Sequence, residues 1–435
     1  MTVTRRAGAL LTASVVAALV AGCSGEQAEP VDDPSMIRIG LLSTLSGPSA
    51  PLGEAANRGA KIALIEAGGS LVGRGPLDTV RGAKVSGKPI HLSIESSNDL
   101  SPDTAVNAAR RLVEQRHVDV VVGPISGDEG LAVKNYISTV PDVTLVNGAA
   151  AAQNMTLRDP APNVFRFSTD GAQWMAGLGE YAAGRYDRIA TVAADRTYVY
   201  DQVGGFLTEF CTPGHSVAKR VWIPAGTHDY AAYVSQIPKD VDAVFVALAG
   251  TEALNFIRQL DEFTGRSLPI IAGSLTVDPA NVAELGDRLE GTVSAGPVAE
   301  RPEDPAYQAY AETLRLYYPD ATPGFADVLY YVAMRATLTA LEQADGDASG
   351  SQQSFRQALA GLVLDTPQGP VRLDANRQAI GNNYLFRVTD GQLALMRAVT
   401  DVTQTLGKDP TTYTAQAAFD RSNPVCGAQR PTETP

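Results

Sequence analysis

The sequence predicts an α/β fold of two doubly wound, parallel-sheet lobes joined by a hinge. Short apolar runs of strand length alternate with segments of helical spacing, and this rhythm favours right-handed βαβ units. The alternation runs from residue 37 to residue 146 and restarts at residue 188, so two blocks of ordinary domain length follow each other. The strand-to-helix loops of the first block are small and polar, as expected where a ligand lies outside the carboxyl ends of parallel strands.

The first block contains four predicted strands and three predicted helices. Ile37 to Leu42 is an apolar run followed by Ser, Gly and Pro, which is typical of a buried strand. Thr104 and Asp103 stand near the start of a helical pattern, where acidic and hydroxyl residues favour the beginning of a helix. The predicted strands are 37–42, 90–95, 118–123 and 143–146, and the predicted helices are 54–66, 102–115 and 130–138.

The second block repeats the pattern with the apolar run Arg188 to Ala193. The predicted strands are 188–193, 217–223 and 241–248, and the predicted helices are 201–210, 229–237 and 252–264.

Composition and charge describe a globular, acidic protein. Hydrophobic residues make up 44% of the chain and charged residues 19%, which excludes an intrinsically disordered chain. The formal net charge is −13 and there is no local basic patch, so nucleic-acid binding is not expected. With four His and three Cys, we expect no metal site and no cofactor.

The N-terminus has the features of an export signal. Arg5 and Arg6 precede an uncharged run from Ala7 to Ala21, which is too short to span a bilayer and suits a secretory signal. The run ends in Val-Ala-Gly followed by Cys23, which resembles a bacterial lipoprotein signal with an acylated cysteine. An ordinary signal peptide with an incidental cysteine is the alternative. We expect residues 1–22 to be the signal and the polar, acidic segment 23–35 to be a tether.

The predicted location is therefore the extracytoplasmic face of the cell membrane, with the lipid as the membrane attachment. The pair of arginines leaves open whether export follows the general secretory or the twin-arginine route. In that compartment Cys211 and Cys426 are expected to form a disulfide that holds the C-terminal tail on the body of the protein. Two free thiols are the alternative.

Three segments in order resemble a known family. They are LLSTLSGPSAPLG at Leu41 to Gly53, VDVVVGPIS at Val118 to Ser126, and VNGAA at Val146 to Ala150. Together with Asn163 to Thr169, they look like the branched-chain amino-acid class of solute-binding proteins of ABC transporters, from about residue 36 to about residue 395.

The resemblance implies the type I periplasmic binding protein fold, in which two lobes joined by three crossovers close on a ligand. The crossovers are expected near Arg166 to Asp170, Ser274 to Pro279 and Asp365 to Leu373. The first lobe would then comprise 36–166 plus 278–364, and the second lobe 167–277 plus 365–435.

The resemblance also implies a ligand site on two loops of the first lobe. Ser126 and Gly127 match the first anion-binding loop, where the family offers a hydroxyl and backbone N–H groups. Ala149 and Ala151 match the second loop, and the family often has Ser or Thr where Ala151 stands. The alanine leaves only backbone groups at that position.

Other residues carried over from the family surround these loops. Tyr198 matches an aromatic lid, and Glu252 matches the carboxylate that holds the ammonium of an amino-acid ligand. Phe325 matches an aromatic wall, Leu52 stands where amino-acid binders often place Tyr, and Ser274 belongs to the second crossover. Three of these residues have a structural alternative: Glu252 suits the first turn of a helix, and Tyr198 and Phe325 suit ordinary packing.

Catalytic patterns are weak. Ser216 and Lys219 fit Ser-x-x-Lys, but the companion motifs of penicillin-binding enzymes are absent and the segment alternates like a strand. We therefore expect no catalytic residue and no enzymatic activity.

The resemblance predicts a binding protein that captures a small ligand and presents it to a membrane permease of an ABC importer. The ligand could be an amino acid, an amide or an aromatic carboxylate, and the sequence does not choose among them or give the oligomeric state. A lipoprotein co-receptor that senses a ligand with the same fold is the alternative function.

Overall fold

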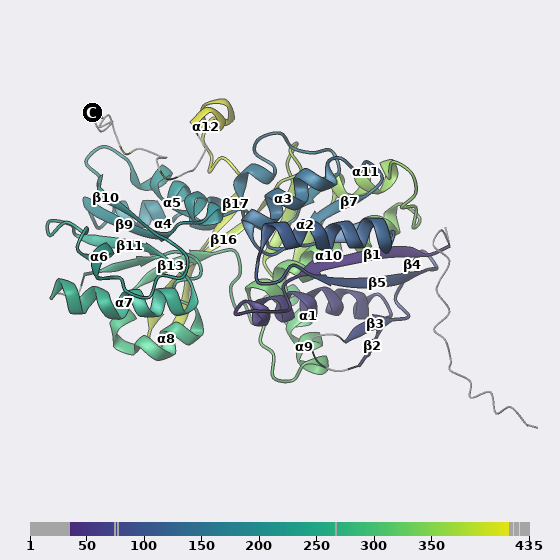
Figure 1. The fold of residues 1–435 in the computed structure, drawn as a ribbon, viewed down its shortest axis with the longest axis horizontal. Helices are drawn as coiled ribbons and strands as arrows, with labels where there is room; N and C mark the ends of the chain where they lie inside the picture. The colour runs from purple at the N-terminus through teal and green to yellow at the C-terminus, as the bar shows by residue number, and fades with distance from the viewer. Residues whose placement is uncertain are drawn as a thin grey trace, which may run out of the picture. The chain divides into compact units, whose positions relative to one another are not determined.

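The computed structural model describes residues 35–73, 75, 78–265, 268–416, 421 and 426, and it is built on two main sheets (Figure 1). The expected signal peptide, Cys23 and the tether up to residue 34 lie outside the described residues.

The first lobe is built on a six-stranded sheet in the order β4-β5-β1-β6-β7-β8, which is parallel from β5 to β8. All residues of β1, β6, β7 and β8 are buried, which explains their continuous apolar runs. Figure 1 shows α2 and α3 on one face of this sheet and α1 on the other. The elements are β1 (Ile37–Ser43), α1 (Ala50–Glu66), β2 (Ser70–Val72), β3 (Thr79–Arg81), β4 (Lys84–Val85), β5 (Lys88–Ser96), α2 (Pro102–Arg110), the π-helical turn η1 (Arg111–Gln115), β6 (Val120–Val122), α3 (Gly127–Ile137), β7 (Thr144–Asn147), the 3₁₀ turn η2 (Gln153–Met155) and β8 (Val164–Arg166), joined later in the chain by α9 (Pro305–Tyr317), α10 (Phe325–Gln343) and α11 (Gln353–Gly361).

The second lobe is built on a nine-stranded sheet in which β10, β9, β11, β12 and β13 are parallel and β16 follows antiparallel to β13. Its strands are β9 (Arg188–Ala194), β10 (Ser216–Ile223), β11 (Ala243–Ala247), β12 (Ile270–Ala272), β13 (Val293–Gly296), β14 (Val363–Thr366), β15 (Gly369–Leu373), β16 (Ala379–Thr389) and β17 (Gln392–Val402). Its helices and turns are η3 (Gln173–Met175), α4 (Leu178–Ala183), α5 (Thr197–Phe210), α6 (Ala231–Val234), α7 (Gly250–Thr264), α8 (Pro279–Leu285), η4 (Gly286–Leu289) and, near the C-terminus, α12 (Pro410–Gln416).

Aromatic and polar contacts hold the helices on the sheets. In the first lobe the buried hydroxyl of Tyr330 on α10 donates to the carbonyl of Leu42 on β1, 2.7 Å away. In the second lobe Phe206 on α5 stacks on Phe245 of β11 with ring centroids 4.2 Å apart. Residues far apart in sequence therefore complete each lobe.

The first two crossings between the lobes can be followed from the strand pairing. The chain leaves the six-stranded sheet after Arg166, at the end of β8. After β12, however, Asp278 accepts a hydrogen bond from the N–H of Asn281 and begins α8, and β13 then pairs with β12. The expected boundary at residue 278 is wrong because Asp278-Pro279 starts another helix of the second lobe. The return crossing lies between β13 and α9, at residues 297–304.

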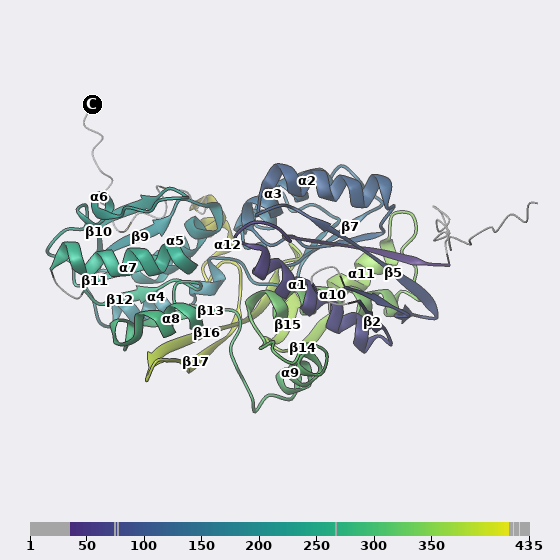
Figure 2. The same cartoon turned by 60° about the horizontal axis from the view of Figure 1, so that its bottom comes forward.

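The third crossing involves the β14–β15 hairpin at residues 363–373, which overlaps the expected segment 365–373. β15 pairs with β16 of the second sheet, while β14 contacts α9 and β15 contacts α11 (Figure 2). A parallel bridge between Arg166 and Gln378 links the start of β16 to the end of β8. The hinge is therefore a place where strands of both sheets meet.

The C-terminal tail is attached to the second lobe. Cys211, just after α5, is disulfide-bonded to Cys426, across 215 residues of sequence. Arg421 forms an ion pair with Asp195, and its carbonyl accepts a hydrogen bond from the indole N–H of Trp222 at 3.1 Å. The disulfide expected from the sequence is present in the structure.

Within the part of the chain that the structure describes, no helix has the length and apolar character needed to cross a bilayer.

Candidate functional site

A cavity of about 590 Å³ lies between the two lobes. Both lobes supply it through the loops that follow their parallel strands, because those strands all end at the same edge of their sheet. Of the nine ligand-site residues expected from the sequence, Ser274 alone does not line the cavity. The lining residues include Leu52, Ile125, Ser126, Gly127, Asp128, Ala149, Ala151, Trp174, Arg196, Tyr198, Glu252, Leu275 and Phe325.

The first loop ends in a capping box at the start of α3. The Ser126 hydroxyl accepts a hydrogen bond from the N–H of Glu129 at 3.3 Å, and the Glu129 carboxylate accepts one from the N–H of Ser126 at 2.8 Å. Burial raises the pKa of Glu129. The Ser126 N–H is thus already used, and one of the two acceptor positions of its hydroxyl is occupied by the Glu129 N–H.

Gly127 allows the second lobe to approach this loop. A Cβ on Gly127 would lie 3.2 Å from the Cβ of Tyr198 and 3.0 Å from the backbone nitrogen of Ala152. Next to it, Asp128 accepts a hydrogen bond from the hydroxyl of Thr197. The starts of α3 and α5 are therefore in contact, and Tyr198 lies beside the first loop.

The second loop offers fewer free backbone N–H groups than the sequence predicts. The N–H of Ala149 is bonded to the carbonyl of Pro124 at 3.0 Å, so it is not free for a ligand. Ala151 uses its carbonyl to accept from the N–H of Gly171 at 2.9 Å, and its own N–H has no acceptor among the described residues. Both alanines are buried, and they give this side of the cavity a small, apolar surface.

Aromatic rings form an apolar wall. Phe325, the first residue of α10, meets Trp174 edge to face with ring centroids 5.1 Å apart. The indole N–H of Trp174 donates to the carbonyl of Thr169 at 3.0 Å, which fixes the ring in the first crossing. Trp174 was not among the residues predicted from the sequence, because a lone tryptophan in an irregular segment carries no periodic signal. Burial raises the pKa of Tyr198, which keeps its hydroxyl protonated; nearby Arg196 opposes that shift.

Glu252 is not free. In the second lobe, β9 and β11 are adjacent parallel strands, so the turn before α5 lies beside the first turn of α7. This places the Arg196 guanidinium 3.1 Å from the Glu252 carboxylate, Nη2 to Oε1, with 35% and 23% of the two side chains exposed. Arg196 was not among the residues predicted from the sequence. Its position just after a predicted strand could have indicated a place in the ligand-binding loops.

Ser274 lies close to the cavity without lining it. Its N–H donates to the side-chain carbonyl of Gln202 at 3.1 Å, and its buried hydroxyl has no partner in the described part of the chain. The neighbouring Leu275 lines the cavity instead. The expected contact with a ligand is therefore not supported by its position.

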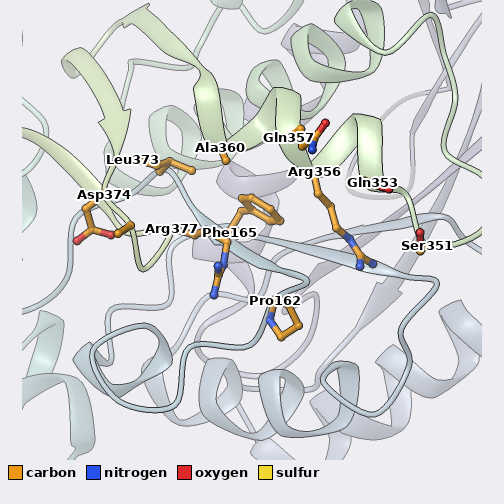
Figure 3. Close-up of a pocket in the computed structure, with 11 residues that line it drawn as sticks. Pro162, Phe165, Ser351, Gln353, Arg356, Gln357, Ala360, Leu373, Asp374 and Arg377 are labelled. Carbon is orange, nitrogen blue, oxygen red and sulfur yellow. The ribbon is translucent and has the colours of Figure 1, made fainter.

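A second cavity, of about 610 Å³, lies on the first lobe between β8, α11 and the turn before β16 (Figure 3). The guanidinium groups of its two lining arginines already donate hydrogen bonds to other residues of the protein. Arg356 donates to the hydroxyl of Thr144 at 2.9 Å, and Arg377 donates to the carbonyl of Pro160 at 3.1 Å. None of the residues predicted to bind ligand lines it.

The described residues contain no group of three or more His, Cys, Asp or Glu side chains arranged to hold a metal ion. In the part of the chain that the structure describes, the interlobe cavity combines backbone groups, one arginine, three carboxylates and an apolar wall, which suits binding of a small organic molecule.

Comparison with known proteins supports the same interpretation. A family model described as periplasmic binding protein matches residues 36–392. An ABC transporter substrate-binding protein from Sphaerobacter thermophilus is 28% identical, with a TM-score of 0.72 over 84% of this chain and 98% of that one.

Two further structures have the same fold at lower identity. One is a solute-binding protein from Rhodopseudomonas palustris in complex with p-hydroxybenzoic acid, at 20% identity, a TM-score of 0.74, and coverage of 85% of this chain and 98% of that one. The other is a leucine binding protein from Thermotoga maritima, at 19% identity, a TM-score of 0.72, and coverage of 84% and 99%. The chain therefore belongs to the periplasmic binding protein family, as a solute-binding protein of the ABC-transporter type with the type I fold.

Proposed function

We propose that this protein is the lipid-anchored, extracytoplasmic component of an ABC importer, which captures a small amino-acid-like, carboxylate or amide ligand and delivers it to a membrane permease. The observation that carries the proposal is the cavity of about 590 Å³ between the lobes, within the size range of small-molecule sites. Relatives described with leucine and with p-hydroxybenzoic acid support both an amino acid and an aromatic acid as ligand classes.

Capture would proceed by closure of the lobes. A ligand bound to the first lobe at Gly127 and Asp128 would be covered by Tyr198 of the second lobe, which already packs on Gly127. Closure shifts a population, so the ligand must contact the closed form better than the open one. Moving the equilibrium from 1:99 to 99:1 requires about 5.5 kcal/mol of differential binding. The permease would recognise the closed arrangement.

A thermal-shift screen tests ligand capture. The mature protein would be heated with members of three groups: amino acids, neutral amides and small carboxylates. A ligand that binds only the native state at 100 times its Kd stabilises it by about 2.7 kcal/mol, so the melting temperature should rise with one group. If no compound in any group changes the melting temperature of a folded sample, the proposal is wrong.

The anchor is tested at Cys23. Replacing Cys23→Ala should leave an unprocessed precursor without fatty acid, because the thiol that would be acylated is gone. Metabolic labelling with a fatty acid, followed by fractionation, measures this. Normal labelling and membrane attachment of the variant would contradict the lipoprotein assignment without affecting the ligand site.

A further inference from the structure

Among the described residues, the charged groups that line the cavity are one arginine and three acidic residues: Arg196, Asp99, Asp128 and Glu252. By count alone this lining is negative and would favour a ligand with a cationic group. The contacts of each carboxylate lead to the opposite conclusion.

Each of the three carboxylates already has a partner at the start of a helix. Asp99 accepts from the N–H of Ser49, 3.2 Å away, at the N-cap of α1. Asp128 lies in the first turn of α3 and accepts from the hydroxyl of Thr197. Glu252 lies in the first turn of α7 and pairs with Arg196. Acidic side chains at these positions are explained by the helix dipoles, so they are not evidence for a bound ammonium.

Five helices begin at the cavity wall. Lining residues fall in the first turn of α1, α3, α5, α7 and α10, at Leu52, Asp128, Tyr198, Glu252 and Phe325. Each helix start carries partial positive charge and unpaired N–H groups, and here the N–H groups of Gly127 and Asp128 have no acceptor among the described residues. These helix starts favour an anionic group between the lobes.

Arg196 is the cationic side chain of this cavity. The hydrogen bond from Arg196 to Glu252 uses one of the five N–H donors of the guanidinium. The other donors remain for a second acceptor. Because both residues belong to the second lobe, the pair persists while the lobes move relative to each other. A ligand ammonium at Glu252 would have to compete with a guanidinium that is already there.

Apart from the charged residues, Ser49, Ser126 and Tyr198, the described lining residues are apolar or glycine, and they include Leu52, Ile125, Trp174, Leu275 and Phe325. Resting on the proposed solute-binding function, we infer that the ligand is a small carboxylate with an apolar or aromatic body and no ammonium, and that Arg196 is the residue that selects it. The carboxylate is held between the Arg196 guanidinium and the N–H groups that begin α3. Glu252 orients the guanidinium and does not bind the ligand.

The test compares ligands that differ only in the ammonium group. Isocaproate is leucine without its ammonium, and hydrocinnamate is phenylalanine without its ammonium. In calorimetric titrations of the mature protein, each acid should bind at least about tenfold more tightly than its amino acid. The ammonium would be buried without a free carboxylate partner, and an unpaired buried charged group costs about tenfold or more in affinity.

Single substitutions test whether Arg196 is responsible for binding the acid. Arg196→Gln should weaken binding of the preferred acid at least about tenfold, and Arg196→Lys should restore part of it because the charge returns. Glu252→Gln keeps the guanidinium and should leave the affinity for the acid unchanged or higher. The matched control is Arg258→Gln on the same helix α7, whose partner is the exposed Glu284 and which does not line the cavity. It should not change binding.

The possible outcomes separate this inference from the proposed function. Tighter binding of leucine or phenylalanine than of the matched acid would overturn the inference and leave solute binding intact. Failure of both acids to bind would also overturn it, and failure of every compound in the thermal-shift screen would overturn the proposed function itself. Equal losses in Arg196→Gln and Glu252→Gln would show that the pair only maintains the loop, which would contradict the selective role of Arg196.

Discussion

At the scale of single residues, the structure changes the role of several side chains that the sequence placed in the site. Ser126 was expected to offer a hydroxyl and an N–H, yet both are engaged with Glu129 in a capping box. Glu252 was expected to meet a ligand ammonium, yet it meets Arg196. Both residues line the cavity. The partner of Ser126 is local, three residues along the chain, whereas the partner of Glu252 lies 56 residues away in the sequence.

Asp327 provides a residue-scale prediction on pH. Its carboxylate, buried at the start of α10, accepts from the guanidinium of Arg58 on α1 at 3.1 Å. Burial raises the pKa of Asp327 to about 6, against the opposing effect of Arg58. The folded protein therefore holds this proton more tightly than the unfolded chain does. The resulting stabilisation is present at low pH and is lost as the pH rises from about 4 to about 6.

The measurement compares wild type with Asp327→Asn, which cannot titrate. The free energy of unfolding of wild type relative to the variant should fall by up to about 3 kcal/mol between about pH 4 and about pH 7, because one pKa unit corresponds to about 1.36 kcal/mol. Denaturant unfolding at several pH values measures this difference, and other titrating groups largely cancel in it. A difference that is independent of pH would refute the raised pKa.

At the scale of elements, the sequence located strands better than helix ends. The predicted strand 188–193 is β9 to within one residue, because an apolar run of that length has few other interpretations. The predicted helix 102–115 is an α-helix to residue 110 and a π-helical turn after it. The predicted helix 229–237 is helical only at residues 231–234. Helix ends depend on local capping and tertiary contacts, which periodicity does not report.

The contact between α1 and α10 gives an element-scale prediction. At Gly59 the backbones approach so closely that a Cβ would lie 1.8 Å from the carbonyl oxygen of Asp327. Gly59→Ala should therefore force the helices apart and destabilise the first lobe, at a cost of about 1–3 kcal/mol or more, as expected for overpacking a core. Thermal and denaturant unfolding measure the effect.

The matched control is Gly184→Ala after α4. Gly184 is exposed, and a Cβ there would meet no atom closer than 3.6 Å. This variant should be nearly as stable as wild type. If both glycine variants were equally stable, this would contradict the close backbone contact between α1 and α10 at Gly59.

At the scale of the whole molecule, the disulfide between Cys211 and Cys426 joins the end of the chain to the second lobe. Thiol counting on the exported protein, under denaturing and non-reducing conditions, should find neither cysteine free. Cys426→Ser should release one thiol and lower the free energy of unfolding by at most about 5 kcal/mol, because a crosslink that closes a very long loop restricts the unfolded chain. Two reactive thiols in the wild-type protein would contradict the pairing.

The sequence by itself determined the α/β character and the division into two blocks, because strand and helix periods are local properties of the chain. The family resemblance supplied the nine expected ligand-site residues, and eight of them line the cavity. The location of the return crossing was decided by the tertiary structure. Val293 to Gly296 becomes a strand of the second lobe only because β12 and β16 pair with it on either side.

The charge balance of the site was likewise decided in three dimensions. Arg196 and Glu252 are 56 residues apart and meet because β9 and β11 are neighbours in the sheet. Trp174 reaches the cavity because the first crossing carries it there against Phe325. A sequence lists charges and rings one by one, but which of them face each other, and which are already neutralised, depends on strand order and on the packing of the two lobes.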